Sequence, residues 1–166
     1  DKKMAKSIIR QTLKGLTHIH GLGYVHGDIK LDNLLIGYDK KIKIADFGYT
    51  SRIEETASGS IKLSGTPEYM PPEAFIKRKW NELFDIWSTG ITCFVLLTRS
   101  YPLRVEKNDT KDFINRLTAL VSAGGHNWDK ILRRHSKLPY EAVTFMKYLL
   151  NPNVNKRLSA KTCLNL

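Results

Sequence analysis

The sequence predicts a mainly helical domain that carries one short β-ribbon. Three observations support this fold class. Apolar residues recur at helical spacing over residues 2–21. Two short apolar runs, 34–36 and 42–45, flank a polar turn and are typical of strands. A longer apolar run, 86–98, is too short to cross a bilayer, and we expect it to form a buried core helix.

The composition describes one compact globular domain. A chain of 166 residues can bury a core, and 42% apolar with 26% charged residues is ordinary for a folded protein. Cys93 and Cys163 lie in or near apolar helical stretches. This placement favours reduced, buried thiols of an intracellular protein, in the cytoplasm or nucleus, over a disulfide framework. No secretory signal is visible at the start of the sequence.

The formal net charge of +11 has two interpretations. A nucleic-acid binder would gather its cations in one patch between exposed aromatic residues. Here Lys and Arg are scattered along the chain, so we expect a solvated basic surface, no nucleic-acid partner and no membrane span. An acidic protein partner remains open.

The first predicted helix ends at Gly21 and Gly23. Its expected apolar face consists of Met4, Ile8, Ile9, Thr12, Leu13, Leu16 and Ile19. His18 and His20 lie near its end, but positions i and i+2 face different sides of a helix and cannot share a metal ion. We therefore expect both histidines at the surface or at the helix terminus.

Ionisable residues cluster around the predicted ribbon. Asp28 and Asp32 precede its first strand together with Lys30 and Asn33, and Asp46 follows its second strand. Carboxylate and amide oxygens suit Mg²⁺, which leaves room for phosphate oxygens. Such a set can hold metal, neutralise phosphate charge and accept a hydroxyl proton. A single Asp or Asn here could equally be a turn or capping residue.

Five stretches together resemble the eukaryotic protein kinases. Residues 26–33 (HGDIKLDN) and 46–48 (DFG) resemble the family's catalytic loop and metal-binding loop. Residues 65–73 (GTPEYMPPE), residues 85–90 (DIWSTG) and Arg157 follow in the family's order. The resemblance covers the whole chain, but only the C-terminal large lobe of the family's domain.

The resemblance implies a serine/threonine protein kinase that transfers the γ-phosphate of MgATP to a protein hydroxyl. Asp28 would accept or orient the hydroxyl proton, and Lys30 would lie over the transferred phosphate. Thr66 would hydrogen-bond both residues and shape the acceptor site, although it could instead be a phosphorylation site. Asp32 is expected at the surface, or facing a basic residue of the substrate.

The resemblance also implies the residues that bind the cofactor. Asn33 and Asp46 would hold Mg²⁺, Lys30 would contact the nucleotide phosphates, and Leu35 would form the apolar floor under the adenine. His26 and Phe47 are expected to be structural packing partners.

The activation segment, residues 46–73, departs from the family pattern. Gly27 replaces the arginine that usually reads a phosphate on this segment, and Lys62 falls near the usual phosphorylated position. We infer a segment that needs no phosphate to become ordered. Four hydroxyl residues keep phosphorylation open: Thr56, Ser58, Ser60 and Ser64. We expect the stretch 54–60 to be mobile.

The remaining elements are expected to build the helical core. A short helix should follow Pro71-Pro72, and Glu73 should pair with Arg157. Asn81 should cap a central helix at about 82–98, in which Asp85 bonds the catalytic-loop amides or complements the helix dipole. Further helices are expected at 112–122 (ended by Gly124-Gly125), from Pro139 to about residue 150, and after Ser159, with a short amphipathic turn at Trp128, Ile131 and Leu132.

The sequence contains no glycine-rich loop, strand lysine, partner glutamate or hinge of a kinase small lobe. We therefore expect the chain alone to be inactive and to bind MgATP weakly, with a missing N-terminal lobe as its partner. The alternative is a pseudokinase or docking scaffold. Retention of Asp28, Lys30, Asn33 and Asp46 argues against a scaffold, which needs none of them.

Overall fold

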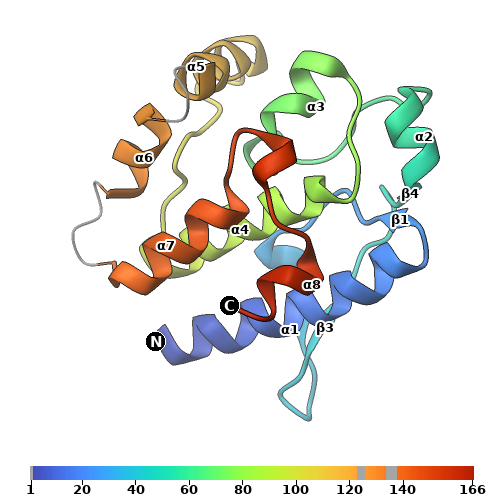
Figure 1. The fold of residues 1–166 in the computed structure, drawn as a ribbon, viewed down its shortest axis with the longest axis vertical. Helices are drawn as coiled ribbons and strands as arrows, with labels where there is room; N and C mark the ends of the chain where they lie inside the picture. Colours follow the sequence, from blue (N-terminus) through green and yellow to red (C-terminus); the bar gives the residue numbers. More distant parts are fainter. Residues whose placement is uncertain (1, 123–125, 134–137) are drawn as a thin grey trace.

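The computed structural model describes residues 2–122, 126–133 and 138–166, and it is mostly helical, as predicted (Figure 1). The helices are α1 (Lys2–Gly21), α2 (Ile53–Ser58), α3 (Pro72–Lys77), α4 (Leu83–Thr98), α5 (Thr110–Ser122), α6 (His126–Arg133), α7 (Tyr140–Leu149) and α8 (Ala160–Cys163). The strands are β1 (Tyr24–Val25), β2 (Leu34–Ile36), β3 (Ile42–Ile44) and β4 (Ser51–Arg52).

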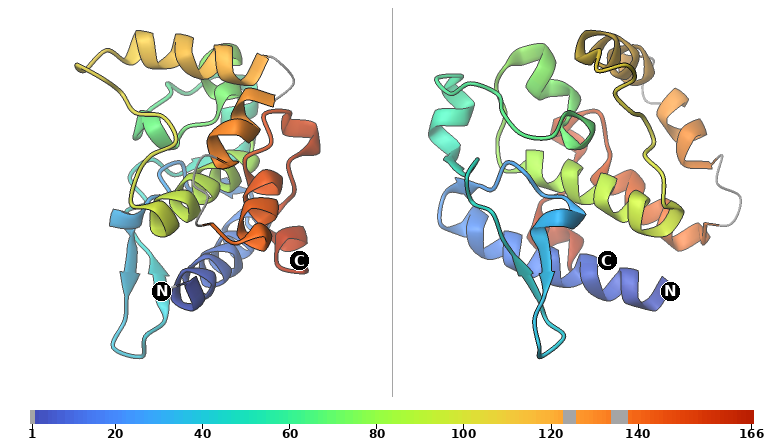
Figure 2. Two further views of the ribbon diagram at one scale, coloured as in Figure 1. Left: turned by 90° about the vertical axis from the view of Figure 1, so that its left-hand side faces the viewer. Right: turned by 180° about the vertical axis from the view of Figure 1, so that it is seen from behind.

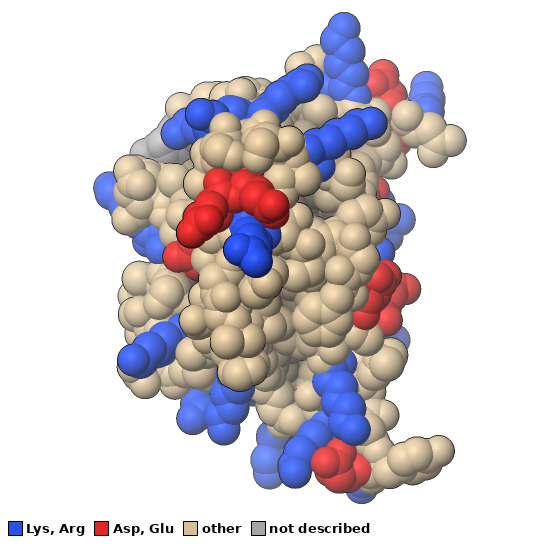
Figure 3. All heavy atoms as spheres, turned by 90° about the vertical axis from the view of Figure 1, so that its right-hand side faces the viewer, with Lys and Arg blue, Asp and Glu red and all other residues tan. Residues whose placement is uncertain are grey.

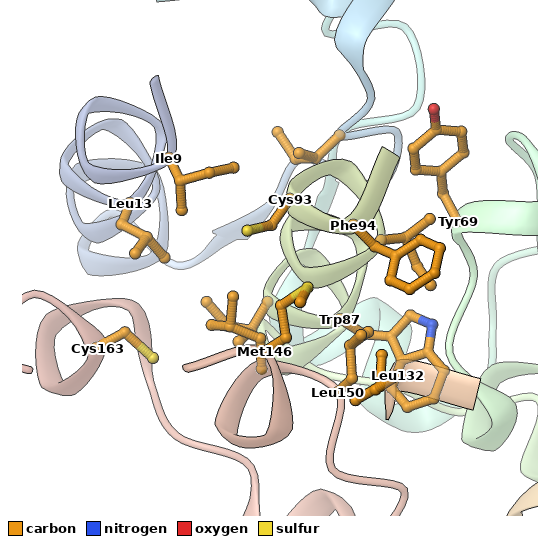
Figure 4. Close-up of a cluster of buried hydrophobic side chains, with 14 of the residues drawn as sticks. Ile9, Leu13, Tyr69, Trp87, Cys93, Phe94, Leu132, Met146, Leu150 and Cys163 are labelled. Carbon is orange, nitrogen blue, oxygen red and sulfur yellow. The ribbon is translucent and has the colours of Figure 1, made fainter. Parts of the chain in front are cut away.

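Helix α4 forms the centre of the molecule and is buried on almost every side, as its apolar composition predicted. Every residue from Phe84 to Phe94 is buried, and α1 and α7 both pack against this helix. Figure 4 shows Ile9 and Leu13 of α1 on the Cys93 side of α4, and Trp87 beside Leu132 and Leu150. The core therefore surrounds α4.

Both cysteines are buried free thiols, as predicted from their apolar surroundings. Burial raises the pKa of Cys93 to about 12 and that of Cys163 to about 11. The two thiols are therefore protonated at neutral pH.

The predicted ribbon is an antiparallel hairpin of β2 and β3, with Leu34 opposite Ile44 and Ile36 opposite Ile42. Its turn is closed by a hydrogen bond from the Gly37 amide to the Lys41 carbonyl, at 2.9 Å. The hairpin lies along α1 and projects from the domain (Figure 2).

A second two-stranded sheet pairs β1 with β4; we expected a short strand at Val25 but did not predict this pairing. Tyr24 lies opposite Arg52, and Val25 lies opposite Ser51. This pairing joins the segment before residue 26 to the segment after residue 48. It therefore ties the two ends of the polar loops together.

The stretch 54–60 is mostly helical rather than an extended loop, because α2 begins at Ile53. The Glu55 carboxylate accepts a hydrogen bond from the Arg52 amide at 3.2 Å, and Gly59 ends the helix at φ 77°. Thr56 is fully buried. Its hydroxyl donates to the Ile53 carbonyl at 2.9 Å, so it is not an exposed modification site.

The predicted pair between Glu73 and Arg157 is present. Arg157 Nη1 donates to Glu73 Oε1 at 2.6 Å and Nη2 donates to Oε2 at 3.0 Å, and both residues are buried. Asn81 caps the start of α4 by accepting from the Leu83 amide, and Ser159 caps α8 by accepting from the Thr162 amide. The predicted break at 124–125 and the side chain of Trp128 lie outside the described residues.

The surface agrees with a dispersed positive charge. On the face shown in Figure 3, Lys and Arg side chains spread from top to bottom, with groups of Asp and Glu between them. Within the described ranges, no helix is both long enough and apolar enough to span a bilayer. Met4, which we placed on the apolar face of α1, is 55% exposed because it lies at the edge of the buried stripe.

Candidate active site

A carboxylate of α4 binds the backbone of the catalytic loop predicted at residues 26–33. Asp85 Oδ2 accepts a hydrogen bond from the His26 amide at 2.8 Å, and Oδ1 accepts from the Gly27 amide at 2.9 Å. Asp85 is completely buried, and hydrogen bonds to a buried carboxylate are strong. The predicted role of Asp85 is confirmed.

His20 also belongs to this cluster. It lies in the last turn of α1, so the predicted place at the helix terminus is confirmed and the alternative place at the surface is not. Its Nε2 lies 2.8 Å from Asp85 Oδ2, and its side chain is only 9% exposed. Because the carboxylate is the acceptor, Nε2 carries the proton. The sequence held a usable signal, since His20 falls on the same helical stripe as the buried Leu13 and Leu16.

Two glycines allow neighbouring segments to approach the loop. Gly27 has φ +86°, and a Cβ atom there would lie 2.7 Å from the Tyr49 carbonyl oxygen. Gly65 has φ +122°, and its Cβ would lie 3.1 Å from the Gly27 carbonyl oxygen. Both positions therefore require glycine in this conformation, which places the activation segment directly against the loop.

Asp28, Lys30 and Thr66 form a closed triangle of polar contacts, as predicted. Lys30 Nζ lies 2.7 Å from Asp28 Oδ2 and donates to Thr66 Oγ1 at 2.9 Å. The Thr66 hydroxyl donates to Asp28 Oδ1 at 3.0 Å. Each corner is thus held by the other two, although Thr66 comes from a segment 38 residues later.

The triangle keeps Asp28 and Lys30 charged. Burial alone raises the pKa of Asp28, but hydrogen bonds from Lys30 and Thr66 outweigh it and leave that pKa below its usual value. Burial lowers the pKa of Lys30, but its contact with Asp28 and the nearby charges of Asp32 and Asp46 raise it overall. The site therefore presents a stable carboxylate–ammonium pair at neutral pH.

Asn33 joins the triangle through its amide nitrogen. Nδ2 donates to the Asp28 carbonyl at 2.8 Å and to Asp28 Oδ2 at 3.1 Å. These two bonds use both donor hydrogens of the side chain and fix the orientation of the amide. The remaining oxygen, Oδ1, makes no hydrogen bond with any described residue and is available as a ligand.

Asp46 lies beside this group rather than in direct contact with it. The Ala45 amide donates to the Asn33 carbonyl at 2.9 Å, which joins the segment directly before Asp46 to the loop at residues 26–33. Asp46 has φ +60°, an uncommon conformation for a non-glycine residue, and its Oδ1 accepts from the Gly48 amide at 3.2 Å. Its carboxylate is exposed.

His26 bridges the two loops as a packing residue, as predicted. It is fully buried, and its Nδ1 accepts a hydrogen bond from the Asp28 amide at 3.3 Å. The proton is therefore on Nε2, which donates to the Ala45 carbonyl at 3.1 Å. The Phe47 ring meets the imidazole edge-on at 5.0 Å between centroids.

The side-chain oxygens near the triangle suit magnesium better than a metal ion that is bound by three or more protein side chains. Within the described ranges, no group of three His, Cys, Asp or Glu side chains could hold a metal ion. Magnesium usually takes only one or two protein oxygens and fills its remaining positions with water and phosphate. Asn33 Oδ1 and the Asp46 carboxylate provide such oxygens.

Leu35 lies apart from the polar cluster. It follows the buried Leu34 on β2 and therefore faces the opposite side of the hairpin, where it is 53% exposed. The neighbouring Ile36 is 65% exposed. The predicted adenine floor is thus an open apolar surface beside the loop.

Comparison with known proteins agrees with these features. The family model described as "Protein kinase domain" matches residues 1–166. The serine/threonine-protein kinase CST20 of Candida albicans is 35% identical over 158 residues, which cover 95% of this chain and 12% of that protein. The serine/threonine-protein kinase ste20 of Emericella nidulans is 32% identical over 158 residues, covering 95% of this chain and 18% of that protein. The chain therefore spans less than a fifth of the length of these relatives.

Proposed function

Because this chain belongs to the protein kinase family, we propose that it forms the catalytic large lobe of a serine/threonine protein kinase. The reaction would transfer the γ-phosphate of MgATP to a hydroxyl of a protein substrate. The observation that carries this proposal is the closed triangle of Asp28, Lys30 and Thr66. A docking scaffold would need no buried carboxylate held ionised beside an ammonium group.

Asp28 is proposed to accept or orient the proton of the attacking hydroxyl. Its Oδ1 is held by Thr66, and its Oδ2 is held by Lys30 and Asn33. Since its pKa is lowered, the carboxylate stays ionised but binds a proton weakly. It therefore suits positioning of the hydroxyl more than early removal of its proton.

Lys30 and Thr66 are proposed to shape the site for serine and threonine. The Lys30 ammonium would neutralise negative charge on the transferred phosphate. Thr66 forms hydrogen bonds with both the Lys30 ammonium and the Asp28 carboxylate, so it fixes the distance between these two groups.

Asn33 and Asp46 are proposed to hold Mg²⁺ through their oxygens, and Leu35 is proposed to lie under the adenine. MgATP would supply the phosphoryl group and the metal charge that stabilises its transfer. The exposed Leu35 also fits a small lobe that would cover it and complete the nucleotide pocket.

The test is phosphotransfer from radiolabelled MgATP to a protein acceptor, with the full-length product that carries this chain. We expect Asp28→Asn to lower turnover by roughly 10²–10⁴-fold, the usual contribution of a positioned acid or base. Asp39→Asn, in the exposed hairpin turn, is the matched control and should be neutral. Wild-type turnover in Asp28→Asn would refute the assignment, and no transfer by the unaltered protein would favour the scaffold.

A further inference from the structure

An apolar groove lies between α1, α4, α7 and α8, on elements that carry none of the proposed catalytic residues. Its volume is about 290 Å³. Its lining includes Ile9, Leu13, Cys93, Leu97, Phe145 and Cys163. Figure 4 shows Ile9 and Leu13 of α1 facing the helices that bear Cys93 and Cys163.

One edge of the groove carries a row of cations. Lys2, Lys6 and Arg10 all line it and are exposed, and they recur every fourth residue along α1. At a rise of 1.5 Å per residue the row extends about 12 Å. Arg10 Nη1 donates to the Leu164 carbonyl at 3.4 Å, which holds the guanidinium toward α8. Glu141 is the acidic residue among those that line the groove.

Part of the apolar lining of the groove is open to solvent, although Ile9, Leu13 and Cys163 are buried. Leu97, Ala142 and Phe145 are partly exposed, and Leu166 is 66% exposed. Contiguous exposed apolar surface with a polar rim is typical of an interaction site. A row of three charges also extends farther than one carboxylate or phosphate group, so a single small anion would leave part of the row without a partner.

We propose that this groove binds an amphipathic helix of a protein partner. The helix would place large apolar side chains in the groove, with Asp or Glu every fourth residue along the flank that faces Lys2, Lys6 and Arg10. Apolar anchors at positions i, i+3, i+4 and i+7 are the usual way a helix fills such a groove. The proposal is independent of phosphotransfer.

The probe is a fluorescein-labelled, 16-residue synthetic helix with leucines on one face and glutamates every fourth residue along the adjoining flank. Its twin replaces these glutamates with lysines and keeps the leucines. By fluorescence anisotropy, we expect the acidic peptide to bind at least about tenfold more tightly at low salt. The preference should shrink as salt screens the rim charges. Equal affinity of the two peptides would refute the proposal.

Two variants locate the binding. Lys6→Glu/Arg10→Glu should reverse the preference, whereas Lys77→Glu/Lys79→Glu makes the same change in charge on exposed residues elsewhere and should not. If both double variants weaken binding of the acidic peptide equally, the peptide is attracted by the positive surface in general. This result would overturn the proposal.

Ala142→Phe adds volume to the groove without changing its charge, and it should weaken binding of both peptides while the melting temperature is kept. Unchanged binding in this variant, or displacement of the acidic peptide by micromolar dodecanoate, would also overturn the proposal. The latter result would assign the groove to an acyl chain.

Discussion

Removal of the Glu73 carboxylate should strongly destabilise the fold, because it leaves a buried guanidinium without its counter-ion. Arg157 donates to both carboxylate oxygens of Glu73, and its side chain is completely buried. Among the described residues, the contacts that Arg157 keeps in Glu73→Ala are its bonds to the Leu83 and Asn151 carbonyls and its stacking over the Trp87 ring. The Arg157 side chain has no exposure to solvent in the folded wild type.

The size of the effect follows from the two lost bonds. Each hydrogen bond to a charged group contributes about 1.5–3 kcal/mol, so the pair represents roughly 3–6 kcal/mol. Breaking one partner of a buried ion pair typically costs about 3–5 kcal/mol. For a domain of this size, each kcal/mol lost from the free energy of unfolding lowers the melting temperature by about 2–4 °C. Glu73→Ala should therefore melt roughly 6–20 °C lower than the wild type.

The assay is thermal and urea unfolding followed by circular dichroism. Asp39→Ala is the matched control, because Asp39 pairs with Lys41 at 3.5 Å on the surface, where an ion pair contributes little to stability. Glu73→Leu/Arg157→Leu should recover part of the loss, since it removes both charges together. If Glu73→Ala melts at the same temperature as Asp39→Ala, the reasoning about the buried pair is refuted.

Three further predictions concern other parts of the chain. Since the folded-state pKa of Asp28 lies below 3.8, the stability difference between wild type and Asp28→Asn should be constant above about pH 5. It should shrink as the pH falls through the folded value, and a pH-independent difference in urea unfolding would contradict this. Gly90→Ala should lose roughly 1–3 kcal/mol, because its Cβ would lie 2.6 Å from Leu150 Cγ, whereas Gly21→Ala meets no atom within 4 Å and should be neutral in the same assay. Phosphatase treatment of the full-length product should leave its kinase activity unchanged, since Lys62 lies where the family usually carries the phosphate; a large loss would show that a phosphate orders the segment.

Most of the helical framework could be predicted from the sequence, because its helices carry an apolar stripe, a continuous apolar run or a capping residue. The stripe of α1 and the apolar run of α4 gave their lengths to within a residue or two. Capping residues such as Asn81 and Ser159 marked where α4 and α8 begin.

The elements that could not be predicted are too short to show a period. Strands β1 and β4 contain two residues each, and their pairing depends on where the rest of the chain places them. Helix α2 has only six residues, and its signals are a capping Glu55 and a terminal Gly59. His20 was placed correctly at the end of α1, but its burial and its buried partner Asp85 were not predicted.

The candidate site could be predicted in its chemistry but not in its distances. The spacing of the residues identified Asp28, Asn33 and Asp46 as possible oxygen ligands. It identified Lys30 as the cation beside them. It could not show that the Asn33 amide uses both its hydrogens on Asp28, which leaves one oxygen free for a ligand. Such orientation depends on contacts between loops, which local sequence does not encode.

These distances depend on α4, which holds both segments that form the triangle. Asp85 fixes the amides of residues 26 and 27, directly before Asp28. One turn further along, Ser88 donates to the Tyr69 carbonyl at 2.8 Å, three residues after Thr66. The contact between Asp28 and Thr66 therefore joins two loops that rest on adjacent turns of the same buried helix. A substitution that shifts α4 should alter the site before it unfolds the domain, since the regular structure of each loop is one short 3-10 helix, Leu31–Asn33 or Pro67–Tyr69.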